Sequence, residues 1–243
     1  MSTSVSQRPV VLYLPGLDGT GRLLYRQVGL FRDYRVLCES YPQDRPQTYE
    51  SLAATAARHL EDASAGQPGI VLAESFGGGV ALTLALMRPE LIERMVLVNT
   101  FAHYPDRVRI SLIAWLSKFL PSGPVHAASR RLRASFFFSS ELTAKDLDAF
   151  WERTADVPMS AMGVRLRMIR ELDLRARLGE ITVPTLVLTS RDDGIVPPAA
   201  GRELARRLPC ARLFKIRAAH AALIHPRIDV ARFLCDPQYW EGF

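Results

Sequence analysis

The chain has 243 residues, of which 48% are hydrophobic and 23% are charged, and its formal net charge is +6. This length and composition are typical of a globular protein with one α/β domain and a buried core, and they argue against a fibrous or disordered chain. The basic residues are scattered and no zinc-finger, RNP or helix-turn-helix pattern accompanies them, so we expect no nucleic-acid partner. The first residues lack the apolar core of a signal peptide, and no segment offers the roughly 20 apolar residues that span a bilayer, so we expect no stable membrane insertion.

The cysteines are odd in number and far apart, at Cys38, Cys210 and Cys235. No C-x-x-C pair occurs, so neither a zinc site nor a redox pair is indicated. We therefore expect reduced, mostly buried thiols in a cytoplasmic protein.

Short apolar runs recur along the chain and indicate strands. They are rich in Val, Leu and Ile and nearly continuous, which is typical of strands covered on both faces. Helix-like segments lie between most of them, and this alternation predicts a parallel, doubly wound sheet. The expected strands are Val10–Leu14, Arg35–Cys38, Ile70–Ala73, Met95–Val98, Thr185–Thr189 and Arg212–Ile216. The expected helices between and after them are Thr48–Asp62, Phe76–Met87, Pro198–Leu208 and Ala221–Leu234.

The alternation stops between Asn99 and Arg177, where no convincing strand occurs. A helical insertion between two strands of an α/β sheet is a natural lid over a site at the strand ends. We therefore expect a core formed by residues 1–99 and 178–243 and a helical cap formed by residues 100–177. The helices expected in the cap are Arg107–Leu120, Ala127–Phe138, Thr143–Thr154 and Ser160–Arg170.

Ser75 stands where a predicted strand becomes a predicted helix, in the segment AESFGGG. In a G-x-S-x-G elbow, small residues are needed two positions before and after the nucleophile because the strand and helix backbones nearly touch. Gly77 meets this requirement, and Ala73 adds only a methyl group. The alternative, a phosphate-binding turn, lacks both a G-x-G-x-x-G pattern and a lysine after the glycines. The pattern therefore favours Ser75 as a nucleophile.

A serine nucleophile needs a base and a carboxylate, and in this architecture they follow it in the order acid, then His. Asp192 and Asp193 come directly after a predicted strand, although Asp-Asp-Gly is also ordinary turn chemistry. The other acid position, after the preceding strand, is Asn99, which has no carboxylate. His220 lies in a loop after the last strand, whereas His225 falls within or at the end of a helical turn and is the weaker candidate for the base.

Two backbone N–H groups are candidates for stabilising an oxyanion. One belongs to Phe76, at the start of the helix that follows Ser75. The other belongs to Leu17, in the segment LPGLDGTG after the first strand, although this segment could be only a surface turn. Asp18 in the same segment could contact substrate or cap the turn, and the sequence leaves both open.

Aromatic residues of the cap offer the one indication of a substrate pocket. Trp115, Phe119, Phe137 and Trp151 could line an apolar pocket for an acyl chain, or they could pack the cap helices against one another. The Arg107–Leu120 segment is amphipathic and could touch a lipid surface, but a solvated cap face is the simpler interpretation.

These features together resemble the α/β-hydrolase family over nearly the whole chain. The resemblance rests on the segments LPGLDGTG, AESFGGG, MRPELIERMVLVN, SRDDGIVP and AAHAALIHP. It implies the α/β-hydrolase fold, with a mostly parallel, doubly wound sheet of about six strands and a helical cap. It also implies that Ser75, Asp193 and His220 form a triad, since the acid of this family commonly precedes x-x-Val-Pro, and that Leu17 and Phe76 form the oxyanion hole. The loop and elbow together are similar to the esterase-like domain of plastid phytyl and fatty-acid ester synthases.

We therefore predict a serine carboxylesterase that cleaves a small-molecule ester through an acyl-enzyme, with no metal or organic cofactor. A serine rather than an aspartate at the elbow argues against dehalogenase chemistry. Acyl transfer to an alcohol and thioester hydrolysis use the same triad and stay open. A non-catalytic binding protein on this fold usually lacks a triad member, and none is missing here. Nothing in the sequence indicates which oligomeric state the protein adopts.

Overall fold

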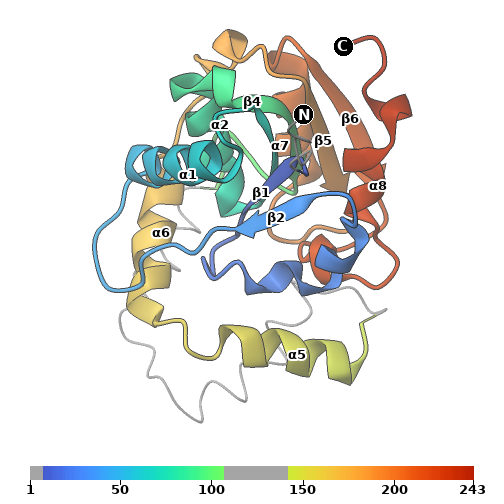
Figure 1. Cartoon of the computed structure of the whole chain (residues 1–243). Helices are drawn as coiled ribbons and strands as arrows, with labels where there is room; N and C mark the ends of the chain where they lie inside the picture. Colours follow the sequence, from blue (N-terminus) through green and yellow to red (C-terminus); the bar gives the residue numbers. More distant parts are fainter. Residues whose placement is uncertain (1–7, 107–141) are drawn as a thin grey trace, which may run out of the picture.

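The computed structural model describes residues 8–106 and 142–243, and the first of these ranges begins just before the first strand. The described strands form one sheet in the order β2-β1-β3-β4-β5-β6, and every neighbouring pair is parallel. The strands are β1 Val10–Leu14, β2 Arg35–Cys38, β3 Gly69–Glu74, β4 Ile92–Val98, β5 Thr185–Ser190 and β6 Ala211–Ile216. This is the expected doubly wound sheet (Figure 1).

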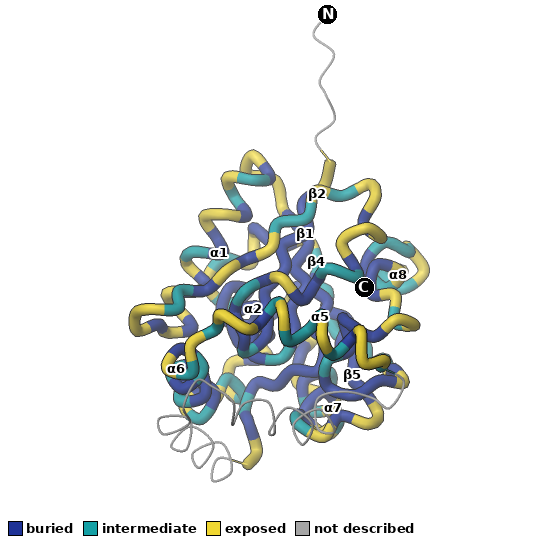
Figure 2. The backbone as a smooth tube through the Cα atoms, turned by 90° about the horizontal axis from the view of Figure 1, so that it is seen from below, coloured by how far each residue is buried: buried dark blue, intermediate teal, exposed yellow. Residues whose placement is uncertain are grey.

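The burial of the strands explains why the sequence pattern located them. The inner strands β1, β3 and β5 are buried along their whole length, whereas the edge strands β2 and β6 are partly exposed. Figure 2 shows the same distribution, with dark blue strands inside and yellow segments on the outer faces of the helices. A strand covered on both faces needs apolar residues at every position, so its sequence is continuous rather than alternating.

Helices cover both faces of the sheet. One face packs against α1 Tyr49–Ala63, α2 Phe76–Met87 and α7 Pro198–Arg207, and the other packs against α8 Val230–Cys235 and the short turns that precede it. The helix α2 is buried on almost every side, which is why it lacks a polar stripe.

The order in which strands are added to the sheet reverses between β1 and β3, because the chain runs from β1 outward to β2 and then returns to β3 on the other side of β1. A crevice opens at such a switch point, outside the carboxyl ends of the two strands, and ligands of open α/β sheets bind there. The segments that follow β1 and β3 begin with Pro15 and Ser75, so the topology brings the two glycine-rich loops of the sequence to this crevice.

Two further helices, α5 Ala144–Thr154 and α6 Met159–Glu171, fall within the expected cap and are drawn in yellow in Figure 1. An isolated bridge joins His103 to Asp173, where the chain leaves the core and returns to it. The helix α5 docks on the turn η1 Arg22–Arg26 through an ion pair between Arg26 and Asp146. The division into core and cap remains our proposal, and these contacts support it.

Several predictions from the sequence differ from the structure. The predicted helix Ala221–Leu234 is wrong in its middle: a short turn, η5 Ala222–Ile224, is followed by extended backbone at His225, and α8 starts only at Val230. Pro226 explains the break, because a proline disfavours helical backbone in the residue before it. The cysteines are free as expected, but the prediction that they are mostly buried is wrong, since Cys38 is exposed and the other two are half-buried. The expected helices Arg107–Leu120 and Ala127–Phe138 lie outside the described residues.

Within residues 8–106 and 142–243, no helix has the length and apolar character needed to cross a membrane.

Candidate active site

Ser75 sits on a strained turn between β3 and α2. Its backbone angles are φ 52° and ψ −117°, a combination that a residue with a side chain adopts only when its surroundings enforce it. A Cβ at Gly77 would lie 2.2 Å from the carbonyl oxygen of Leu14, so only glycine fits two positions after the serine. Thr100 also holds the turn, because its hydroxyl donates a 2.6 Å hydrogen bond to the Ser75 carbonyl.

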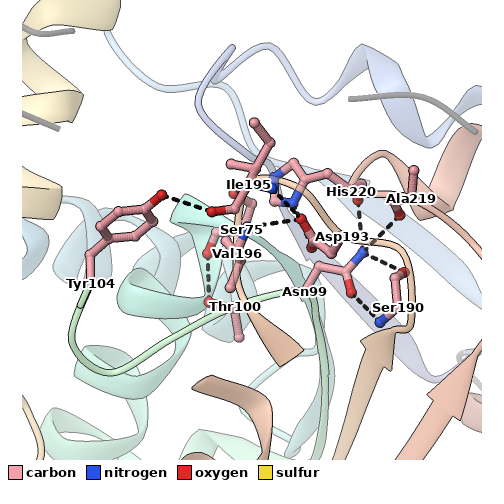
Figure 3. A network of polar contacts seen from close by, with 10 residues as sticks. All are labelled: Ser75, Asn99, Thr100, Tyr104, Ser190, Asp193, Ile195, Val196, Ala219 and His220. Atoms are coloured by element: carbon pink, nitrogen blue, oxygen red, sulfur yellow. Dashed lines mark hydrogen bonds and ion pairs between the residues drawn. The ribbon is translucent and has the colours of Figure 1, made fainter. Parts of the chain in front are cut away.

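Ser75, His220 and Asp193 are linked by hydrogen bonds, although they come from three separate loops (Figure 3). The Ser75 Oγ lies 3.0 Å from His220 Nε2, and His220 Nδ1 lies 2.8 Å from Asp193 Oδ2. An ionised carboxylate only accepts hydrogen bonds, so we assign the imidazole proton to Nδ1, which leaves Nε2 free to accept the serine proton.

Asp193, rather than Asp192, faces the histidine. The second oxygen of Asp193 accepts hydrogen bonds from the backbone N–H groups of Ile195 and Val196, each 2.8 Å long, and the side chain is buried. Asp192 is exposed. The two N–H bonds fix the carboxylate plane, so the other oxygen is aimed at the imidazole.

Asn99 occupies the position after β4, where another acid could have stood, and it braces the histidine loop instead. Its amide group donates 2.8 Å hydrogen bonds to the Ser190 hydroxyl and to the His220 carbonyl, and its oxygen accepts one from the Ser190 N–H. Its φ of 48° is in the left-handed region, which asparagine tolerates better than most residues. His225, the weaker candidate for the base, is buried elsewhere, with its Nδ1 accepting from the Arg227 N–H.

The loop after β1 lies directly against the nucleophile. A Cβ at Gly16 would be 3.7 Å from the Ser75 Cβ, and the Gly16 carbonyl accepts a 3.0 Å hydrogen bond from the Gly19 N–H. That bond orients the peptide group that carries the Leu17 N–H. Phe76 is the first residue of α2, and the first N–H groups of a helix have no partner within it. Both candidate oxyanion donors therefore border Ser75.

A buried arginine from the cap helix α6 holds the same loop. The Arg165 guanidinium donates to the carbonyl oxygens of Leu17, Asp18 and Pro42 at 2.9, 3.0 and 3.0 Å. The guanidinium packs on Gly19, where a Cβ would come within 2.6 Å of it, so glycine is required there. The cap and the loop beside the nucleophile are thus one connected unit.

A cavity of about 140 Å³ opens over Ser75 and His220. Its apolar walls come from the loop after β1, from η1 and η5, and from both cap helices. Trp151 lies in this wall beside Phe150, so the structure brings it to the nucleophile. Trp115, Phe119 and Phe137, the other aromatic residues proposed for the pocket, lie outside the described residues.

Two carboxylates interrupt the apolar lining of this cavity, from Asp18 and Glu74. Asp18 caps its own turn, because its Oδ2 accepts from the backbone and the hydroxyl of Thr20, and it also borders the cavity. Glu74 is buried, and one of its oxygens accepts a 3.3 Å hydrogen bond from the Tyr13 hydroxyl. Burial raises the pKa of Glu74 from 4.5 to about 7, partly opposed by His220 and reinforced by the Asp18 charge.

Sequence reasoning missed Arg165, Glu74 and Thr100 as parts of the site. Glu74 directly follows a predicted strand and Thr100 lies two residues after the next one, at the edge where ligands of such sheets bind, and that position was an available signal. Arg165 had none, because its partners lie more than a hundred residues away in the chain. The described residues contain no group of three or more His, Cys, Asp or Glu side chains that could hold a metal ion.

Comparisons with known proteins agree with this fold. A family model described as serine aminopeptidase, S33 (Hydrolase_4) matches residues 44–222. Among curated relatives, a protein named as the carbamate hydrolase RutD from Pseudomonas savastanoi pv. phaseolicola is 28% identical over 246 residues, which cover 94% of this chain and 93% of the relative. A protein of the same name from Stutzerimonas stutzeri is 26% identical and covers 94% of this chain and 91% of its own.

Solved structures show the same fold. A thermophilic esterase from Thermogutta terrifontis superposes with a TM-score of 0.79 at 18% identity, over 96% of this chain and 89% of the esterase. The enol-lactonase from Burkholderia xenovorans superposes with a TM-score of 0.76 at 22% identity, over 91% of this chain and 87% of the lactonase. With the family model covering most of the chain, this protein is a serine hydrolase of the α/β-hydrolase superfamily and belongs to the Hydrolase_4 family.

Proposed function

We propose that this chain is a carboxylic ester hydrolase that works through an acyl-enzyme on Ser75. The observation that carries the proposal is the hydrogen-bonded series from Ser75 Oγ through His220 to Asp193, on a strained elbow beside a cavity. A serine hydroxyl is a weak nucleophile by itself, and a base held by a carboxylate is the arrangement that activates it.

In the proposed reaction, His220 Nε2 takes the proton from Ser75 Oγ while that oxygen bonds to the ester carbonyl carbon. The carbonyl oxygen becomes an oxyanion, which the N–H groups of Leu17 and Phe76 stabilise. The tetrahedral intermediate collapses, its bond to the alcohol oxygen breaks, and the alcohol leaves with the proton from His220. A water molecule then gives a proton to His220 and attacks the acyl-enzyme, which releases the acid and restores Ser75. Asp193 stabilises the imidazolium in both halves.

Carbamate hydrolysis is a second candidate, favoured by the relatives that carry that name over more than 90% of this chain. A carbamate has a carbonyl flanked by one oxygen and one nitrogen, and either can be the leaving group, so the same attack by Ser75 applies. The rate on carbamates relative to esters distinguishes the two candidates.

The test is hydrolysis of p-nitrophenyl esters with acyl chains from short to long, and of a p-nitrophenyl carbamate, by the wild type and Ser75→Ala. We expect turnover by the wild type and a loss of about 10³-fold or more in the variant. Asp193→Asn should lose a comparable factor, whereas the neighbouring Asp192→Asn is the matched control and should stay within about twofold. No turnover of any ester, even with an added alcohol as acyl acceptor, would refute the proposal.

A further inference from the structure

The cavity beside Ser75 contains more negative charge than an apolar ester needs. Asp18 and Glu74 both border it, from the loop after β1 and from the end of β3, while most of the other lining residues are apolar or aromatic. A buried carboxylate is costly unless it is paired, so two of them in one small cavity require an explanation.

Glu74 is the more informative of the two. Only 7% of Glu74 is exposed, and no side chain donates a hydrogen bond to its Oε1. The groups that face the carboxyl are the Tyr13 hydroxyl from β1, the Leu223 N–H from η5, the Asp18 carboxylate and His220. Among them only His220 can carry positive charge. A buried carboxyl that borders a cavity and receives few hydrogen bonds is suited to a donor that arrives with a ligand.

Asp18 adds a second carboxyl group to the same wall. Its Oδ2 is held by Thr20, and its Oδ1 would lie 3.8 Å from a Cβ placed on Gly16. Gly16 itself lies against Ser75, so this oxygen is close to the nucleophile.

The aromatic side of the cavity suits the same kind of ligand. Trp151 and Phe150 line it from α5, and aromatic faces attract cations that have left water. Carboxylates on one wall and aromatic rings on another form an environment that favours an organic ammonium group over a neutral group of equal size.

We propose that this cavity binds a protonated amine carried by the alcohol part of the ester, through Glu74 and Asp18. The inference rests on the proposed esterase function and names its substrate class. The alcohol side is assigned because His220 protonates the leaving oxygen, and Glu74, Ala221 and Ile224 line the cavity alongside His220.

The test compares two acetates of the same shape, 2-(dimethylamino)ethyl acetate and 3-methylbutyl acetate, which differ by an ammonium N–H in place of a C–H. We expect the wild type to prefer the cationic ester by about 10- to 100-fold in kcat/KM, the range of one charged hydrogen bond. Glu74→Gln and Asp18→Asn should each reduce this ratio by about tenfold. Glu50→Gln, which removes an exposed carboxylate on α1, is the matched control and should leave the ratio within about twofold.

A second comparison uses acetylcholine and 3,3-dimethylbutyl acetate, because the charge of a quaternary ammonium does not change with pH. The preference for the cation should grow between pH 6 and pH 8 as Glu74 ionises, and Glu74→Gln should abolish that growth. No preference for the cation in the wild type, or a preference that neither Glu74→Gln nor Asp18→Asn reduces, would overturn the inference while leaving the esterase function intact.

Binding to Ser75→Ala separates the inference from the esterase function. Calorimetry with the first two acetates measures how tightly each binds to this variant, which cannot hydrolyse them through Ser75. If the wild type hydrolyses no ester, tighter binding of the cationic acetate still supports the amine site, and equal binding of both acetates overturns it.

Discussion

Replacing Asn99 tests whether the histidine loop is held from the end of β4. The side chain is buried, it makes hydrogen bonds to Ser190 and His220, and its φ is 48°. Asn99→Ala removes these bonds and forces alanine into left-handed backbone. Asn99→Gly removes the same bonds without the backbone strain, since glycine adopts positive φ readily.

The expected loss can be summed from the contacts. Each lost hydrogen bond removes about 1 kcal/mol, and leaving the buried Ser190 N–H without its acceptor costs about 1–3 kcal/mol. Positive φ in alanine adds roughly 1 kcal/mol. Asn99→Ala should therefore lower the free energy of unfolding by about 4–6 kcal/mol, and Asn99→Gly by about 0.5–1 kcal/mol less. Because the His220 carbonyl loses its donor, kcat should also fall by about 10- to 100-fold.

Urea unfolding and ester kinetics at a temperature where all variants are folded measure these two effects. Ser190→Ala is the matched control, because it removes one partner of Asn99 without touching the main chain of His220. It should destabilise by about 1 kcal/mol and leave kcat within about threefold. If Asn99→Ala unfolds within about 0.5 kcal/mol of the wild type and keeps its kcat, the reasoning about this brace is refuted.

Three further predictions concern the elbow, the loop and the buried acid. Gly77→Ala would place a Cβ 2.2 Å from the Leu14 carbonyl oxygen and should destabilise by about 3 kcal/mol or more in thermal unfolding, whereas Gly179→Ala, with open space around it, should be tolerated. Arg165→Met should lower kcat more than it changes KM, because three carbonyl groups lose their donor and the loop beside Ser75 is released. Arg165→Lys should restore only part of the rate. Full activity of the Met variant would contradict the role of Arg165 in holding the loop. Glu74 has a pKa raised from 4.5 to about 7, so the folded state holds its proton more tightly and stability should fall by about 3 kcal/mol as pH rises from 4.5 to 7 and then level off. Urea unfolding of Glu74→Gln against pH should lack this fall, and identical pH profiles for the two proteins would contradict it.

Much of the fold could be predicted because its strands are buried on both faces. The expected bounds of Val10–Leu14 and Arg35–Cys38 coincide with β1 and β2. The bounds of the other strands differ by at most one residue, except at the start of β4. The α2 helix was also predicted to the residue. The last helix was predicted incorrectly, because the apolar pattern continues through Pro226, where the helix is interrupted in the structure.

Only some residues of the candidate site could likewise be predicted from the sequence. Ser75, Asp193 and His220 could be proposed from local signals, because each follows a strand and parallel strands deliver their carboxyl ends to one edge of the sheet. Asn99 was considered only as a missing acid, and its bracing role depends on contacts with residues about a hundred positions away.

The sequence alone thus determined the order of the elements, the strained elbow and the chemical types of the reacting residues, since these depend on local backbone preference and on the apolar periodicity. Only the tertiary structure decided which polar groups face the cavity and which hold the loops in place. Arg165 reaches the loop beside Ser75 from the cap, and Glu74 borders the cavity while its carboxyl accepts a hydrogen bond from Tyr13. Such contacts join residues distant in the chain, and no local pattern specifies them, because each depends on how the cap and the sheet pack together.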